Sequence, residues 1–411
     1  MERKSFLSIL IIAVFFSIYF LFIKSEKTLA PIEIELDNST QNKKELLEGK
    51  LSNSIKITEP KKEIDQSLIL TINTSSNHIE TPEEVHGLYF TSLFFNQKYF
   101  LDFVRNMKTS NKINTLIIDV KDLDGFVAYD SKVKEVIDYK TKKNIIKDIK
   151  KKIEDLHKEG FYLIARINVF NDQAVAQSRP ELTLKSNSGE PWKTDKGAFW
   201  LNPDSEKVWI YNTNLGIEAY NLGFDEINFD YIRFPSEGNM EDLNLGEITG
   251  YSSTIQRFSS FLRNQFKNIK ISADIFAYSL IEKNNLGIGQ KYEDFFPYFD
   301  YICPMMYPSH YNKNFLGFEN SALHPYEVVR YSLIIGKNRA LDFFKNNPDK
   351  NLSFKMRPWF QSFSLGDYYD KNMIQSQITA LNDEVSINKD FWNGWLLWDA
   401  SNIYSNFSAL K

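Results

Sequence analysis

The chain has 411 residues, a formal net charge of −4 from 49 Lys and Arg against 53 Asp and Glu, one cysteine and five histidines. The near-neutral charge argues against a nucleic-acid partner, which calls for a basic surface, and the single Cys303 excludes an intramolecular disulfide and a cysteine-based zinc site. The histidines show neither HxH nor HExxH spacing, so the sequence predicts no metal centre and no cofactor.

The first 23 residues predict a membrane anchor. Arg3 and Lys4 precede residues 6–23, a run without any charged side chain. As a helix this run spans about 27 Å, just enough for the hydrocarbon core of a bilayer. A cleaved signal peptide is the alternative, although the run is long for one and Pro31 follows the best small-residue site. Either interpretation predicts export, and the positive charge before the run predicts a chain that faces outward from the cytoplasm.

Residues 24–80 predict a flexible polar linker. They contain no Phe, Trp or Tyr, and charges of both signs alternate with Ser, Asn and Thr. Such a tract buries too little apolar surface to offset the entropy of ordering it. The boundary is soft, because residues 68–72 are apolar enough to dock as an edge strand.

From residue 81 to residue 411, eight short apolar runs alternate with longer amphipathic stretches. Strands separated by helices pair in parallel, so this region predicts an α/β fold, a (β/α)8 TIM barrel. A doubly wound open sheet is the alternative, but no glycine-rich phosphate loop follows the first strand. The predicted strands are residues 87–91, 115–120, 162–169, 226–234, 270–276, 301–307, 354–361 and 394–399, and the predicted helices are residues 99–109, 142–159, 205–221, 251–268, 326–345 and 373–382.

Acidic side chains lie near the carboxyl ends of the predicted strands, where barrels of this type carry their active sites. In the fourth strand Glu226, Asn228 and Asp230 alternate and therefore point to the same side of the sheet. The fifth strand repeats this spacing with Ser272 and Asp274. Neighbouring strands lie about 4.8 Å apart, which suits the separation of about 5 Å between the two carboxyl groups of a retaining glycosidase. Asp230 and Asp274 are therefore the candidate pair, and a structural ion pair with Lys or Arg is the alternative for each acid.

Other side chains near the strand ends predict a carbohydrate-binding mouth. Arginine holds carboxylates in a fixed forked geometry, and the tryptophans are candidate platforms for sugar rings. Acids and aromatics without a histidine cluster suit glycoside hydrolysis, which needs one protonated and one ionised carboxyl group. The deepest acid of its row, Glu226, is expected to support the barrel or to orient Arg166. The predicted substrate-binding residues are Asp119, Arg166, Arg233, Tyr307, His310, Arg357, Trp359, Gln361 and Trp398.

Eight segments carry a family resemblance: IDVKDLDG (118–125), LIARINVF (163–170), GFDEINFDYIRFP (223–235), ADIF (273–276), IGQKYED (288–294), CPMMYPSHY (303–311), RPWFQSF (357–363) and GWLLWDASNIY (394–404). In this order they resemble the bacterial "putative glycosyl hydrolase domain" family over about residues 84–407. The resemblance implies a (β/α)8 barrel distantly similar to the α-amylase and α-galactosidase groups. In those groups a fourth-strand aspartate is the nucleophile, which implies that role for Asp230. Two positions depart from the family pattern, Asn228 where Gln is expected and Asp399 where Asn is expected, and neither removes a carboxylate.

These observations favour a glycosidase that is held outside the cytoplasmic membrane and acts on an envelope or extracellular polysaccharide. Asp230 is then the nucleophile and Asp274 the general acid and base, with Glu293 as the reserve candidate for the acid. A non-catalytic, envelope-tethered glycan-binding protein that uses the same barrel mouth is the alternative, since a fold does not establish a function. A phosphate- or metal-dependent hydrolase is a third interpretation.

Overall fold

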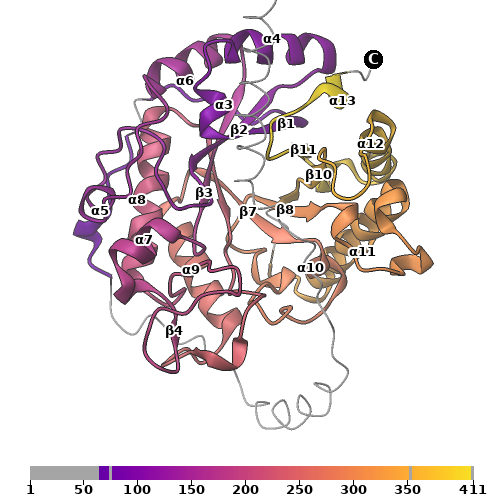
Figure 1. Ribbon diagram of the computed structural model, residues 1–411. Coiled ribbons are helices and arrows are strands. Elements are labelled where there is room, and N and C mark those ends of the chain that lie inside the picture. The colour runs from indigo at the N-terminus through magenta and orange to yellow at the C-terminus, as the bar shows by residue number, and fades with distance from the viewer. Residues whose placement is uncertain (1–63, 74–75, 351–353, 409–411) are drawn as a thin grey trace, which may run out of the picture. The chain divides into compact units, whose positions relative to one another are not determined.

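Parallel strands close into a barrel at the centre of the computed structural model, which describes residues 64–73, 76–350 and 354–408 (Figure 1). The ring closes because β11 pairs with β1 and β10 pairs with both β8 and β11, and every pairing around it is parallel. This confirms the predicted (β/α)8 barrel. In their order around the ring the strands are β1 (Val85–Phe90), β2 (Thr115–Lys121), β3 (Tyr162–Asn168), β5 (Glu226–Asp230), β7 (Lys270–Phe276), β8 (Tyr301–Met306), β9 (Lys355–Met356) with β10 (Trp359–Gln361), and β11 (Gly394–Trp398).

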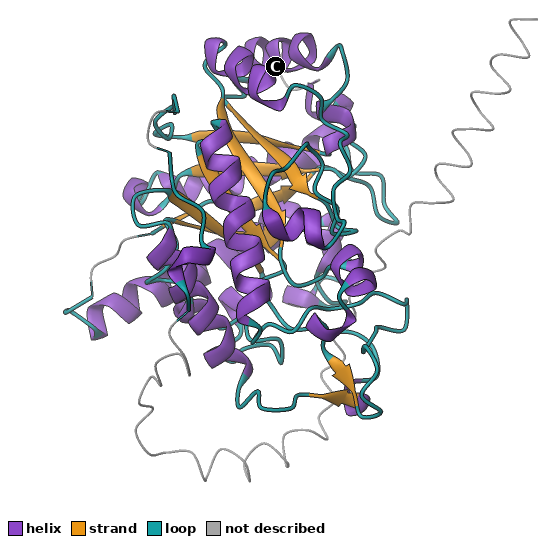
Figure 2. Cartoon of the chain, turned by 90° about the vertical axis from the view of Figure 1, so that its left-hand side faces the viewer, coloured by secondary structure: helices purple, strands orange, loops and turns teal. Residues whose placement is uncertain are grey.

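Helices surround the strands on the outside of the barrel (Figure 2). The apolar core accordingly has two parts, one between strands and helices and a smaller one inside the barrel. The longer helices are α4 (Phe100–Asn111), α6 (Ile149–Lys158), α8 (Glu206–Leu222), α9 (Tyr251–Gln265), α11 (Pro325–Asn346) and α12 (Lys371–Val385). The shorter ones are α3 (Ser92–Phe95), α5 (Lys134–Asp138), α7 (Gln173–Ser178), α10 (Tyr278–Ile281) and α13 (Ser405–Ser408), and a two-stranded sheet of β4 (Lys185–Ser186) and β6 (Leu243–Asn244) lies apart from the barrel.

The fourth barrel strand is shorter than predicted. The prediction extended it to residue 234, whereas β5 ends at Asp230 because Tyr231 adopts a left-handed conformation with φ of 55°. An L-residue in that conformation cannot continue a strand. The chain therefore turns directly after Asp230, at the mouth of the barrel.

The second predicted helix starts later than expected. Residues 142–148 are not helical, because the N–H groups of Ile145 and Ile146 both donate to the carbonyl oxygen of Ala128, at 2.8 and 2.7 Å. Asp148 is left-handed, with φ of 50°, and α6 follows it. Tertiary hydrogen bonds thus override a local helical pattern.

The seventh barrel strand is interrupted between β9 and β10. Pro358 has no N–H to give to a neighbouring strand, while the N–H of Arg357 donates to the Ile302 carbonyl at 3.0 Å. The register resumes where Trp359 pairs with Met305. The Arg357 side chain, at this interruption, is fully buried.

Part of the predicted linker packs on the barrel domain. Residues 64–73 run along α8, where the Asn214 side chain accepts from the N–H of Leu70 and donates to the Leu68 carbonyl, both at 2.9 Å. The N–H of Ile79 donates to the Asp225 carboxylate at 2.7 Å. These contacts are made by side chains, so the segment docks on α8 without the edge strand considered for residues 68–72. Residues 24–63 and 74–75 of the linker and the predicted anchor lie outside the described residues, and within the described ones no helix is long and apolar enough to cross a membrane.

Replacing Asn214 by alanine is expected to detach this segment. Asn214 is buried, and the change leaves the two backbone groups of residues 68 and 70 without their partner, which costs about 1–3 kcal/mol of unfolding free energy. Limited proteolysis is expected to cut residues 64–73 of the variant faster than those of the wild type. Asn221→Ala is the control, because Asn221 binds the same segment in a more exposed place and should cost less. Equal cleavage rates for the wild type and Asn214→Ala would contradict this expectation.

Candidate active site at the carboxyl ends of the strands

Three carboxylates from three strands contact one arginine inside the barrel mouth. Arg166 on β3 donates from Nη1 to Asp119 on β2 at 2.6 Å, and its Nη2 forms an ion pair with Asp230 on β5. Its Nε lies 3.7 Å from a carboxylate oxygen of Asp274 on β7. All four side chains are almost completely buried, so their charges interact with little screening by solvent.

The strand register explains why these residues meet. Asp119 pairs with Arg166, and Arg166 pairs with Asn228, which places all three at one height on the inner face. Asp230 pairs with Asn168 one inward position further along, and its main-chain oxygen accepts from Val169 at 3.0 Å. Because side chains alternate between the two faces of a strand, every second residue of each strand enters the barrel.

Asp274 is held as a buried acid. Its Oδ1 accepts from the Trp359 indole at 2.7 Å and from the Asn228 amide at 2.9 Å, and the residue is 1% exposed. Burial, and secondly the nearby charge of Asp230, raise the pKa of Asp274 to about 8, while Arg166 opposes the shift. The Asp274 carboxyl is thus predominantly protonated at pH 7, whereas the ion pair with Arg166 calls for an ionised Asp230.

Aromatic side chains enclose this network. The Tyr89 hydroxyl donates to Asp119, and the Tyr89 ring stacks on Trp398 with 3.8 Å between centroids. The Arg166 guanidinium lies 4.8 Å from the centroid of the Trp398 ring. Burial, followed by the charges of Asp274 and Asp230, raises the pKa of Tyr307 well above its usual value. Sequence reasoning missed Tyr89, although it occupies an inward position of the first strand.

Arg357 belongs to a second, deeper ion pair. Its Nη1 donates to both Glu226 oxygens, at 2.9 and 3.1 Å, and its Nε and Nη2 donate to the Asn393 side chain. The Tyr162 hydroxyl also donates to Glu226, at 3.0 Å. Arg357 is fully buried, so its place is in the barrel interior, which differs from the predicted contact with substrate. Glu226 supports the barrel, as predicted, and its partner is Arg357 instead of Arg166.

Two further predicted residues, His310 and Gln361, lie at the mouth of the barrel, on the loop after β8 and at the end of β10. His310 lies beside Tyr307 and Phe363, and burial lowers the pKa of its ring to about 4, so it is neutral at pH 7. Gln361 is fully buried, and its side chain binds main-chain groups of Ser309 and Phe363. It therefore fixes the loops that carry His310.

Glu293, the reserve acid, lies away from this group. Its carboxylate accepts from Arg339 on α11 at 2.6 and 3.1 Å. The structure therefore leaves Asp274 as the candidate acid. Within residues 64–73, 76–350 and 354–408, no group of three or more His, Cys, Asp or Glu side chains is arranged to hold a metal ion.

Arg233 lies on the turn that follows β5 and is 4% exposed. The rings of Trp200, Tyr231 and Phe276 lie 4.7, 5.2 and 4.7 Å from its guanidinium carbon. Its Nη1 donates to the Phe234 carbonyl at 3.0 Å. Burial lowers the pKa of Arg233, and the nearby charges of Tyr231, Glu237 and Asp230 only partly counter this.

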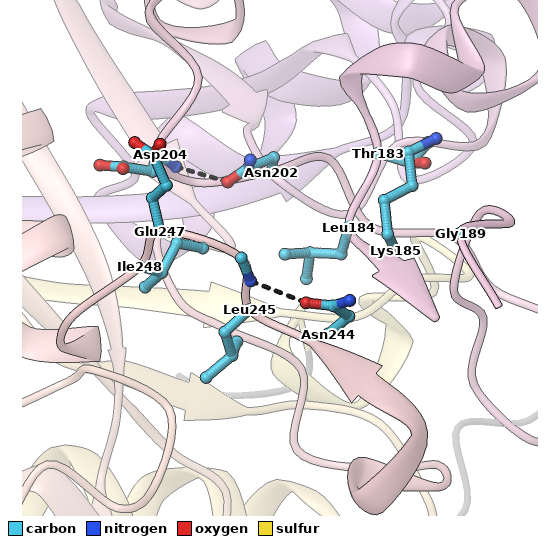
Figure 3. A pocket seen from close by; sticks show the side chains of 11 residues that line it. Thr183, Leu184, Lys185, Gly189, Asn202, Asp204, Asn244, Leu245, Glu247 and Ile248 are labelled. Carbon is cyan, nitrogen blue, oxygen red and sulfur yellow. Dashed lines mark hydrogen bonds between the residues drawn. The ribbon is translucent and has the colours of Figure 1, made fainter. Parts of the chain in front are cut away.

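A cavity of about 440 Å³ lies between the loops that follow β3 and β5, beside the small sheet (Figure 3). None of the residues in the Arg166 network lines it. Its walls combine the aliphatic side chains of Leu184, Leu245 and Ile248 with polar ones such as Asn202 and Asn244. The cavity is therefore a feature of the loops and is separate from the candidate acids.

Residues 87–404 match the family described as "Putative glycosyl hydrolase domain". No curated protein matches the chain significantly.

Three solved structures are among those similar to the chain, and for each we give the sequence identity, the share of both chains that is covered and the TM-score. A hypothetical protein from Ruminiclostridium thermocellum is 30% identical, over 46% of this chain and 96% of that one, with a TM-score of 0.43. An α-galactosidase from Thermus thermophilus is 11% identical, over 79% of this chain and 60% of that one, with a TM-score of 0.46. The glycoside hydrolase domain of PelA from Pseudomonas aeruginosa is 8% identical, over 78% and 96%, with a TM-score of 0.41. The family match spans most of the sequence and all or part of every barrel strand, and the chain belongs to the "Putative glycosyl hydrolase domain" family.

Proposed function

We propose that this protein is a glycosidase in which Asp230 is the nucleophile and Asp274 the general acid and base. The observation that carries the proposal is the pair itself. Two carboxyl groups on neighbouring strands contact the same arginine, and their surroundings favour opposite protonation states. Glycoside hydrolysis needs one carboxyl group of each kind.

Each group has a defined task in this mechanism. The ionised Asp230 attacks the anomeric carbon, while the protonated Asp274 gives its proton to the departing glycosidic oxygen. Asp274 then takes a proton from the water that hydrolyses the glycosyl–enzyme bond. Since adjacent strands lie about 4.8 Å apart, the pair fits the shorter carboxyl separation, and we expect the anomeric configuration to be retained.

We further propose that the substrate is a polysaccharide of the cell envelope or of the extracellular medium. The charged and apolar pattern of residues 3–23 supports this location, with the chain anchored in the membrane and the barrel outside the cytoplasm. Trp398, which is partly exposed, and Tyr307, beside which His310 lies, are aromatic side chains of the mouth, and their presence there supports a carbohydrate ligand.

The pH dependence of kcat/KM is expected to report the proton on Asp274. Because the acid must be protonated and its pKa is about 8, kcat/KM should fall as the pH rises through about 8. In Asp274→Asn this basic limb should disappear, and an aryl glycoside with a good leaving group, which does not need the acid, should still be cleaved. A basic limb that persists in Asp274→Asn would assign it to another group.

A glycan-binding protein without catalysis is the second candidate, and one observation favours it. Asp274 is 1% exposed and Asp230 5% exposed, so substrate access to the pair requires some opening of the mouth. In that interpretation Asp119 and Asp230 only balance the charge of Arg166.

The test of the proposal is release of reducing ends from a panel of bacterial envelope and extracellular polysaccharides by the full chain. Release by the wild type and none by Asp230→Asn would support the glycosidase and name its substrate class. Binding without release, unaltered by Asp230→Asn, would support the glycan-binding protein and reject the glycosidase.

A further inference from the structure

Arg233 differs from the other two arginines that the strand ends bring into the barrel. Arg166 is paired with Asp119 and Asp230, and Arg357 is paired with Glu226. In the part of the chain that the structure describes, no carboxylate lies within 4 Å of the Arg233 nitrogens. A buried cation without a counter-ion is costly, and proteins rarely keep one without a use for it.

One edge of the Arg233 guanidinium is free. Nη1 is occupied by the Phe234 carbonyl and, at 3.2 Å, by the Ser236 hydroxyl. Nε and Nη2 donate to no described residue, and neither is among the nitrogens sealed from solvent, unlike the Nε of Arg166. These two groups present parallel N–H bonds along one edge, the arrangement that binds both oxygens of a carboxylate or phosphate.

The place of Arg233 connects this edge with the candidate acids. Tyr231 directly follows Asp230, and Phe276 ends the strand that carries Asp274, two residues further along. Both rings contact the Arg233 guanidinium, and the charge of Asp230 acts on it. Arg233 therefore lies next to the ends of the two strands that carry the candidate acids.

We propose that Arg233 binds an acidic group of the saccharide, and hence that the substrate is an anionic polysaccharide carrying carboxylates, as in uronic acids, or phosphates. This inference rests on the proposed use of the barrel mouth for a saccharide. The aromatic contacts fix the plane of the guanidinium before the ligand arrives, so little entropy is lost when the anion binds. A hydroxyl group of a neutral sugar would accept a hydrogen bond from this edge but bring no counter-charge to Arg233.

Binding measurements on the full chain with Asp230→Asn test the inference without turnover. The probes are oligomers of galacturonate, glucuronate and mannuronate, the methyl ester of the galacturonate oligomer, and a glycerol-phosphate teichoic acid. Isothermal titration is done for the parent variant and after adding Arg233→Met, Arg233→Lys or Arg179→Met. Arg179 is the matched control, because its guanidinium also lies over a ring, that of Tyr139, at 5.1 Å. Its hydrogen bond goes to the Asp138 carbonyl, which is not part of the candidate site.

We expect at least one acidic probe to bind at least about 10-fold more tightly than the ester, because a charge-assisted pair with arginine is worth more than a neutral hydrogen bond. Arg233→Met should remove most of this preference, Arg233→Lys should keep part of it, and Arg179→Met should leave it intact. Uronates and teichoic acid distinguish a carboxylate from a phosphate ligand. If Arg233→Met fails to fold, competition by acetate and inorganic phosphate against the parent, compared with Arg233→Lys, gives the same information.

Equal affinity for acid and ester, an acid preference unchanged in Arg233→Met, or no binding of any acidic probe would overturn the inference. Hydrolysis of neutral polysaccharides alone would also overturn it while leaving the glycosidase in place. Conversely, acid-selective binding that depends on Arg233, without any hydrolysis, would retain this assignment and reject the glycosidase.

Discussion

Replacing Asp230 by asparagine is expected to lower turnover by at least about 10³-fold while the barrel stays folded, because the amide has no carboxylate to attack the sugar. The fold should tolerate the change, since asparagine has nearly the same size and Arg166 keeps its 2.6 Å hydrogen bond to Asp119. The measurement is the initial rate of reducing-end release, with circular dichroism and Tm to confirm folding.

Asp119→Asn is the matched control for this prediction. It makes the same substitution on the same guanidinium, so it tests whether loss of a partner of Arg166 is enough to stop the reaction. We expect a smaller loss, seen mainly in KM. Azide provides a second control, because this small anion can replace the missing carboxylate in Asp230→Ala and should yield a glycosyl azide. If Asp230→Asn keeps more than about one-tenth of the wild-type turnover, Asp230 is not the nucleophile.

Replacing Arg357 by methionine is expected to cost about 3–5 kcal/mol of unfolding free energy. Arg357 and Glu226 are both fully buried, and the change leaves the Glu226 carboxylate without a cation in the barrel interior. Denaturant unfolding of the full chain measures the loss. Because the pair lies deeper than the candidate acids, any variant protein that still folds should keep the pH dependence of the wild type.

The double variant Glu226→Gln with Arg357→Met separates lost charge from lost packing. The amide oxygen that replaces the carboxylate can still accept from the Tyr162 hydroxyl, and no buried charge remains, so most of the stability should return. A double variant as unstable as Arg357→Met alone would show that the shape of the arginine, and its contact 3.8 Å from the Tyr301 ring, carries the stability instead.

The barrel was predictable because its strands are local patterns of apolar side chains. β7 has the predicted bounds, the other strands differ from prediction by a few residues at their ends, and the seventh is also interrupted between β9 and β10. The errors in the prediction concern backbone conformations that are determined by tertiary contacts. The left-handed Tyr231 that ends β5 and the contacts of Ala128 that delay α6 both depend on the surrounding fold, and a sequence pattern does not encode them.

The candidate site was predictable to a similar degree. Alternation along β5 and β7 identified Asp230 and Asp274 as neighbours on the inner face, and both contact Arg166. Alternation gives the face and the height of a side chain, but not its partner across the ring. For this reason the sequence predicts that Arg357 binds substrate, whereas in the structure Arg357 forms an ion pair with Glu226 on a strand that is not adjacent to its own.

The closing seam of the barrel has a consequence for how the chain is made. Val85 to Leu88 on β1 pair with Gly394 to Leu397 on β11, so the first and last strands of the domain complete each other. During synthesis the edge of β1 stays unpaired until almost the whole domain has left the ribosome. Contacts between such distant segments form slowly, and open strand edges attract other chains in the meantime. A growing chain of this protein therefore exposes this strand edge to other chains until its final strand arrives.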